Sequence, residues 1–93
     1  MPTPRSYLTP TSAEERAQRR AEFGQTIRTH RRRAGLTQEQ VALAAGLDRP
    51  FLVQVEGGKR SMLVERLPDL AQALGVTVAD LFPGRPLGEC SSC

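Results

Sequence analysis

The sequence predicts a compact, all-α domain, and three kinds of observation support this fold class. Capping boxes, in which a hydroxyl residue is followed three positions later by an acidic or amide residue, mark helix starts at Ser12 with Glu15, Thr37 with Gln40, and Thr77 with Asp80. Glycines follow helix-periodic stretches, as expected at helix ends. The composition, with 39% hydrophobic residues and no Trp, is compatible with one small helical core in a chain of 93 residues.

The first helix is expected to begin at Ser12. Residues 1–11 contain three prolines and have little to bury, so they are expected to form a flexible arm. Gly24 costs a helix about 1 kcal/mol relative to Ala, so a break or bend is expected there. Beyond it, Phe23, Ile27 and Ala34 share one face, and Arg31 lies on that face too.

Residues 37–57 contain two short helices joined by a tight turn. Thr37 caps the first helix, and Gly46 occupies the position where a left-handed residue ends it. Asp48 is expected to cap the second helix, with Pro50 in its first turn, where a missing N–H costs nothing. The chain therefore stops, turns and restarts within about three residues, the spacing of a helix-turn-helix.

The second of these helices has an unusual free side. If Leu52 and Val55 face the core, a step of about 100° per residue puts Pro50, Val53 and Gln54 on the opposite side, with Arg49 flanking them. Arg pairs with guanine, Gln pairs with adenine, and Val or Pro carbons contact a thymine methyl group. Asp48 would repel a phosphate but can accept from a cytosine amino group. This face suits the major groove of DNA.

The rest of the chain predicts two more helices. Leu67, Leu70, Ala71 and Leu74 recur at amphipathic spacing before Gly75, and Pro68 places the start of that helix near residues 65–67. The Thr77 capping box opens a short helix that ends at Pro83. Residues 84–93 are expected to be a flexible tail ending in Cys90 and Cys93. A C-x-x-C pair in such a tail is interpreted as exposed and reducible, with thiol sensing or metal shared between subunits as alternatives.

Four segments in order resemble the lambdoid-repressor-like helix-turn-helix regulators, also called the Xre or Cro/C1 type. They are LTQEQVA from Leu36, AAGLDRP, VEGGKR and LAQALGVTVADLF, and the resemblance runs from about Phe23 to Phe82. It implies a five-helix lambda-repressor-like DNA-binding domain at residues 12–83, whose third helix, residues 49–56, reads DNA. The helix from Ser12 would then be an N-terminal extension, because the first helix of the family would start near Glu22.

The resemblance also implies roles for individual residues. It pairs Arg31 with Glu56 as a structural ion pair, and it implies DNA phosphate contacts by Gln38, Lys59 and Arg60. Arg32 is a further phosphate candidate, within a basic stretch that is otherwise interpreted as solvated. The family buries a two-fold dimer contact near Val64, Leu81 and Phe82, although these residues could equally belong to the core of the protomer. Two departures from the family pattern, Asp48 and Pro50, leave base reading mainly to Arg49 and Gln54.

Composition and charge limit the classes of partner that the protein is expected to have. The net charge of +3 and the concentration of positive charge before Gly35 favour an anionic partner. No apolar run is long enough for a membrane span, and the N-terminus is unlike a signal peptide, so a cytoplasmic, nucleoid-associated protein is expected. No catalytic set, metal cluster or cofactor motif is recognisable, so the sequence predicts no enzyme, no metal and no cofactor, and a small-molecule ligand is not expected.

Two functions follow from the sequence. The first is a sequence-specific transcriptional regulator that binds an inverted-repeat operator in double-stranded DNA as a homodimer. The alternative is a protein-interaction module, such as an antitoxin or an adaptor, in which Pro50, Phe51 and Val53 bind a partner protein.

Overall fold

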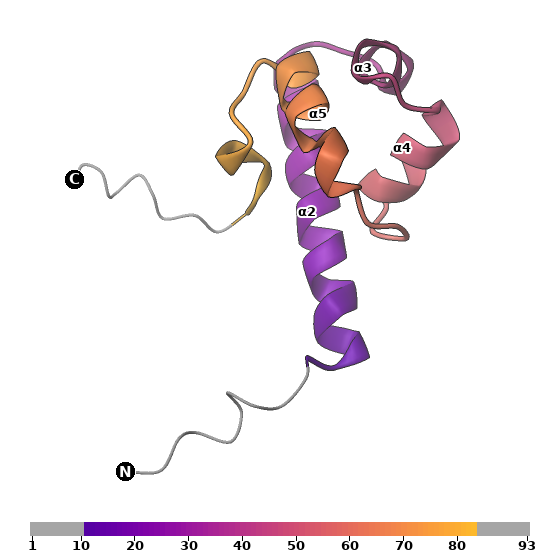
Figure 1. The fold of residues 1–93 in the computed structure, drawn as a ribbon, viewed down its shortest axis with the longest axis vertical. Helices are drawn as coiled ribbons and strands as arrows, with labels where there is room; N and C mark the ends of the chain where they lie inside the picture. The colour runs from indigo at the N-terminus through magenta and orange to yellow at the C-terminus, as the bar shows by residue number, and fades with distance from the viewer. Residues whose placement is uncertain (1–10, 84–93) are drawn as a thin grey trace, which may run out of the picture.

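The computed structural model describes residues 11–83, and in that part of the chain every regular element is helical (Figure 1). The four α-helices are α2 (Ala13–Arg33), α3 (Gln38–Ala45), α4 (Arg49–Glu56) and α5 (Leu67–Leu74), and two 3-10 turns are η1 (Val64–Arg66) and η2 (Ala79–Leu81). Helix α2 packs against α4, and α3 packs against both α4 and α5. No helix within residues 11–83 has both the length and the apolar character that crossing a membrane requires. The expected arm and tail lie almost entirely outside the described residues.

Helix α2 is one continuous helix of 21 residues, capped by the predicted Ser12–Glu15 box. The extension ahead of Glu22 is present, but the expected break at Gly24 is wrong. Gly24 is buried, and a Cβ at this position would lie 2.3 Å from the carbonyl oxygen of Val55 and 2.6 Å from that of Glu56. Its missing side chain therefore lets the backbones of α2 and α4 meet, and this packing offsets the intrinsic cost of glycine in a helix.

One face of each α-helix contributes to the hydrophobic core. Its fully buried side chains of largest volume are Ile27, Leu52, Leu70, Leu81, Val41 and Val55. The expected Thr37–Gln40 box caps α3, and Gly46 ends it with φ 72° in the left-handed region. Ala34, predicted on the core face, is instead the exposed residue that ends α2. The helix-turn-helix pair α3 and α4 is thus fixed on α2 and α5 by shared apolar contacts.

The expected fifth helix is a single 3-10 turn, η2, so residues 11–83 contain four α-helices rather than five. The capping hydrogen bonds between Thr77 and Asp80 do form, at 3.1 and 3.2 Å. Phe82, however, precedes Pro83 and is extended, with φ −101° and ψ 132°. The ring of a proline disfavours helical geometry in the preceding residue, and this ends the element after one turn.

Leu81 is fully buried and belongs to the core of the protomer. It therefore cannot contribute to the dimer contact that the family resemblance suggested for it. The other two residues of that contact remain available, because Val64 is 80% exposed and Phe82 is 46% exposed.

Candidate nucleic-acid interface

Helix α4 presents the free face that the sequence predicted. Leu52 and Val55 are buried, whereas Arg49, Pro50 and Gln54 are exposed. Val53, on the same side, is 41% exposed. The eight residues of α4 thus expose a guanidinium, an amide and two small apolar groups on one side, while the other side is anchored in the core.

Asp48 occupies the N-cap position of α4 but makes no capping hydrogen bond with its side chain. The predicted capping contact is therefore wrong. An N-cap side chain accepts from the N–H of the second or third helical residue; the second here is Pro50, which has none, so only the N–H of Phe51 is left to accept from, and Asp48 does not use it. The exposed carboxylate of Asp48 remains beside the outward face of α4.

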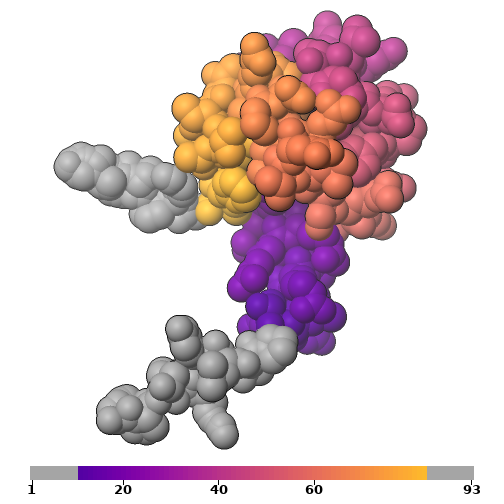
Figure 2. All heavy atoms as spheres, in the orientation of Figure 1, coloured from indigo at the N-terminus to yellow at the C-terminus, as the bar shows by residue number. Residues whose placement is uncertain are grey.

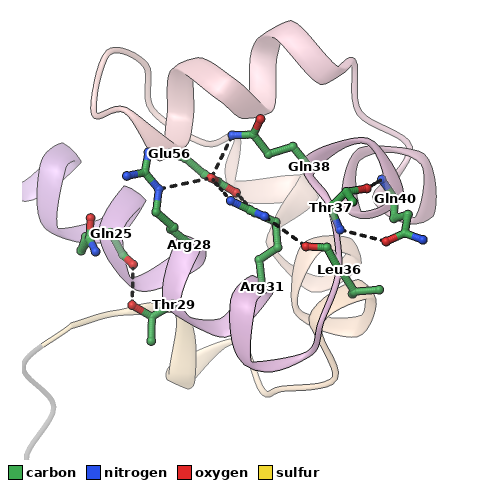
Figure 3. A network of polar contacts seen from close by, with 9 residues as sticks. All are labelled: Gln25, Arg28, Thr29, Arg31, Leu36, Thr37, Gln38, Gln40 and Glu56. Carbon is green, nitrogen blue, oxygen red and sulfur yellow. Dashed lines mark hydrogen bonds and ion pairs between the residues drawn. The ribbon is translucent and has the colours of Figure 1, made fainter.

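A buried carboxylate anchors the C-terminal end of α4 (Figure 3). Glu56 is 3% exposed, and its Oε2 accepts from Nε of Arg31 at 2.8 Å while its Oε1 accepts from Nη2 of Arg31 at 3.1 Å. Nε2 of Gln38 donates to Oε1 at 3.0 Å, and Nε of Arg28 lies 3.6 Å from the same oxygen. This single side chain joins α2, α3 and α4.

The network has a surplus of positive charge. Two guanidinium groups, of Arg28 and Arg31, face one carboxylate. The remaining Nη1 of Arg31 donates to the backbone oxygen of Leu36 at 3.0 Å. Within residues 11–83 no buried side-chain nitrogen or oxygen lacks a partner. A bidentate pair with every group satisfied can be tolerated in the interior, whereas an unpaired charge cannot.

Gln38 and Arg49 lie around one polar hollow of about 370 Å³, at the N-terminus of α3. Arg31 and Thr37 also line it. The structure thus brings together one predicted phosphate contact and one predicted base-reading residue, at the beginning of α4. Backbone N–H groups at the start of a helix and nearby guanidinium groups both favour an anion, whereas Glu39, which also lines the hollow, opposes one.

The loop after α4 carries two more of the predicted phosphate contacts, Lys59 and Arg60, and both are exposed. Gly58 has φ 77°, and a Cβ on it would lie 2.9 Å from Cα of Ala21 in α2. The N–H of Lys59 donates to the carbonyl oxygen of Gln54 at 2.8 Å. The guanidinium of Arg60 lies 5.3 Å from the centroid of the Phe51 ring, within cation–π distance. The loop is therefore held on α4 and against α2.

Three contributors to this region escaped the sequence-based predictions. Arg28 shares Glu56 with Arg31, and its position one helical turn earlier was a usable signal. Arg20 donates from Nε to the carbonyl oxygen of Gly58 at 3.4 Å, and Phe51 lies half-buried beside Arg60 instead of being exposed. Arg20 and Gly58 are 38 residues apart in the sequence, and Phe51 and Arg60 are nine apart, so no helical periodicity marks either contact. Arg32 is exposed, and its side chain makes no hydrogen bond or ion pair with another residue in the described part of the chain.

The fold and this face define a helix-turn-helix DNA-binding protein of the transcription-regulator class. Residues 22–81 match the sequence profile of the helix-turn-helix domain. The chain belongs to this family, in its Xre, or Cro/C1, type.

Individual relatives agree with this assignment. The chain is 45% identical over 51 residues to the uncharacterized HTH-type transcriptional regulator y4dJ of Sinorhizobium fredii, covering 55% of this chain and 66% of that protein. It is 31% identical over 69 residues to the control protein C.BamHI of Bacillus amyloliquefaciens, covering 73% and 85% of the two chains. The crystal structure of the restriction-modification controller C.AhdI of Aeromonas hydrophila superposes with a TM-score of 0.66 at 38% identity, over 68% of this chain and 96% of that one.

Proposed function

We propose that the protein is a sequence-specific transcriptional regulator that binds an inverted-repeat operator as a homodimer, with α4 in the major groove. The observation that carries the proposal is the outward face of α4. Arg49 would pair with a guanine and Gln54 with an adenine, each such bidentate pair being worth about 1–3 kcal/mol of discrimination. Pro50 and Val53 would contact thymine methyl groups, and Asp48 would accept from a cytosine amino group.

Phosphate contacts are proposed at both ends of α4. Its eight residues span about 12 Å, which is close to the width of the major groove. Gln38 borders the hollow at the beginning of α4, and Lys59 and Arg60 follow its end. Phosphate-binding groups at both ends, an amide at the beginning and two cations after the end, suit the two DNA strands that border the groove, and Arg32 is proposed as a further contact. With several such contacts in each half-site, affinity should fall steeply as salt rises.

The homodimer is proposed from the exposed apolar residues Val64 and Phe82. Two copies related by a two-fold axis would present their α4 helices to successive major grooves about 34 Å apart, so the operator should be an inverted repeat. Such a regulator would act on the nucleoid in the cytoplasm.

The arrangement of Phe51 argues against an adaptor that binds protein through α4. The Phe51 ring lies under Arg60 and is half-buried, so the exposed apolar surface of this face reduces to Pro50 and Val53. Two small apolar groups flanked by an Arg and a Gln suit base edges better than an apolar protein surface.

Selection of bound sequences from a pool of random DNA duplexes tests the proposal. The wild type should enrich an inverted repeat, and Arg49→Ala with Gln54→Ala should lose it. The matched control replaces one exposed arginine and one exposed glutamine of α2, Arg33→Ala with Gln25→Ala, and should enrich the same motif as the wild type. An enriched motif that the Arg49 and Gln54 variant leaves unchanged would refute the base-reading assignment, and no enriched motif at all would refute sequence-specific binding.

A further inference from the structure

A second hollow, of about 410 Å³, lies between α2, the loop after α4 and the end of the described chain. Phe23, Val64 and Phe82 are among its lining residues, and the rings of Phe23 and Phe82 are 5.4 Å apart at an interplanar angle of 49°. Val64 is 80% exposed, and no large apolar side chain in residues 11–83 is more exposed. Apolar side chains gathered in an open hollow are typical of a surface that a partner covers.

Positive charge borders this apolar surface. Arg19, Arg20 and Arg60 all line the hollow. Arg20 is bonded to the carbonyl oxygen of Gly58, and Arg60 lies over Phe51. The Arg19 side chain has no hydrogen bond or ion pair with any other residue of the described part. The hollow also includes Glu22, whose carboxylate accepts from the Gln18 amide at 2.9 Å and keeps its charge, so the lining still carries three arginines against one carboxylate. The surface therefore suits a partner that is apolar in its centre and acidic at its edge.

Arg19 lies on the half of α2 that extends beyond the family domain. The match to the family begins at residue 22, and residues 13–21 precede it over about 13 Å of helix. Figure 2 shows this indigo half of the helix standing clear of the rest of the molecule. Residues 13–19 are all exposed, while the close contact of Ala21 with Gly58 holds the base of the extension in place. The extension thus presents Arg19 beside the hollow on a fixed helix.

A second copy of the chain carries the complementary charge. In a two-fold interface the same surface faces itself, so a basic edge needs a carboxylate on that same surface. Among the carboxylates of residues 11–83, four are exposed and have no hydrogen bond or ion pair to another described residue: Glu14, Glu39, Asp48 and Glu65. Of these, Glu65 directly follows Val64, which lines the hollow. Glu39 and Asp48 belong to the helix-turn-helix, and Glu14 lies in the first turn of α2, more than one turn before Arg19 and outside the lining of the hollow.

We propose that the hollow is the interface with a second copy of this chain, and that Arg19 of each copy pairs with the Glu65 of the other. The apolar side chains of Val64 and Phe82 would meet at the centre, and two Arg19–Glu65 pairs would flank them. This inference rests on the proposed homodimer and adds that the interface depends on the helical extension outside the family domain. A surface ion pair contributes little by itself, but the two-fold axis makes each pair occur twice.

The test is a charge exchange in the full chain, measured by sedimentation equilibrium without DNA and with a reductant that keeps Cys90 and Cys93 reduced. Arg19→Glu and Glu65→Arg should each weaken the dimer about tenfold, because each replaces two attractions by two repulsions. The combined variant should return the dissociation constant to within about threefold of the wild type. Arg33→Glu, an exposed substitution near the other end of α2, is the control for a general effect of charge and should leave the dimer unchanged.

The outcomes separate this inference from the homodimer itself. Weakening by each single substitution and recovery in the combined variant would support the pairing. A dimer that is indifferent to Arg19→Glu, or singles that weaken without recovery in the combination, would overturn the pairing and leave the homodimer standing. A wild type that remains monomeric at every concentration would overturn both. Circular dichroism of each variant checks that a lost dimer reflects the surface and not unfolding.

Discussion

Replacing Glu56 by Ala should be among the most damaging single changes in this protein. The substitution leaves the Arg31 guanidinium, whose side chain is 13% exposed, without its carboxylate, and it removes the acceptor of Gln38. Breaking a buried pair in this way costs about 3–5 kcal/mol. A chain of 93 residues has a total stability of about 5–14 kcal/mol, so the change removes a large share of it.

Urea unfolding followed by far-ultraviolet circular dichroism measures this loss. With an m-value of about 1 kcal/mol/M, the midpoint should fall by about 3 M or more. Replacing both partners, Glu56→Leu with Arg31→Met, should recover part of the loss, because the double variant leaves no unpaired charge at position 31. The Arg28 side chain is exposed enough to turn toward water. Arg32→Met is the control: this neighbouring arginine is exposed and unpaired in the described part, so the loss should stay below about 0.5 kcal/mol. A loss below about 1 kcal/mol for Glu56→Ala, or a double variant no more stable than the single one, would refute the reasoning.

Two further predictions concern packing and the loop after α4. Gly24→Ala should destabilise the protein by about 1–3 kcal/mol despite the better helix propensity of Ala, because its Cβ meets the Val55 carbonyl oxygen; an unchanged or raised melting temperature would contradict the close packing. Phe51→Leu should weaken operator binding about threefold to tenfold, because Arg60 loses the ring that holds it. The slope of log K against log salt should stay near that of the wild type for Phe51→Leu, whereas its magnitude should decrease by about one for Arg60→Ala. Equal slopes in both variants would contradict a positioning role for Phe51.

Helix starts were predictable where both capping partners lie within four residues of each other. The Ser12, Thr37 and Thr77 boxes all form, because each depends on local geometry alone. The Asp48 prediction failed although it was local, since it overlooked that Pro50 removes one of the two N–H groups available to a cap. The prediction of a short last helix was wrong for a similar reason, because Pro83 restricts the backbone conformation of Phe82.

The remaining features depend on contacts between segments that are distant in the sequence. Gly24 signals a weak helix when it is considered alone, but in the fold it is where α2 and α4 meet backbone to backbone. The Arg20–Gly58 contact is similarly distant in the sequence, whereas the Phe51–Arg60 contact depends on how the loop after α4 folds back over that helix. Apolar periodicity predicts which side of a helix is buried but not which backbone it approaches, so these positions could be interpreted only once the helices had been placed.

The Glu56 network limits what Gln38 can do in the proposed complex. An amide nitrogen has two N–H groups, and one of them already donates to Oε1 of Glu56. A phosphate at the N-terminus of α3 would therefore meet the second amide N–H and the free backbone N–H of Gln38, in an orientation set by Glu56. Because Glu56 is the last residue of α4 and also binds Arg28 and Arg31, the same carboxylate would fix the proposed recognition helix relative to this proposed phosphate contact. The distance between the proposed base-reading groups and the proposed phosphate-binding groups would thus depend on one buried side chain. For this reason, changes at Glu56 should reduce operator affinity even in molecules that remain folded.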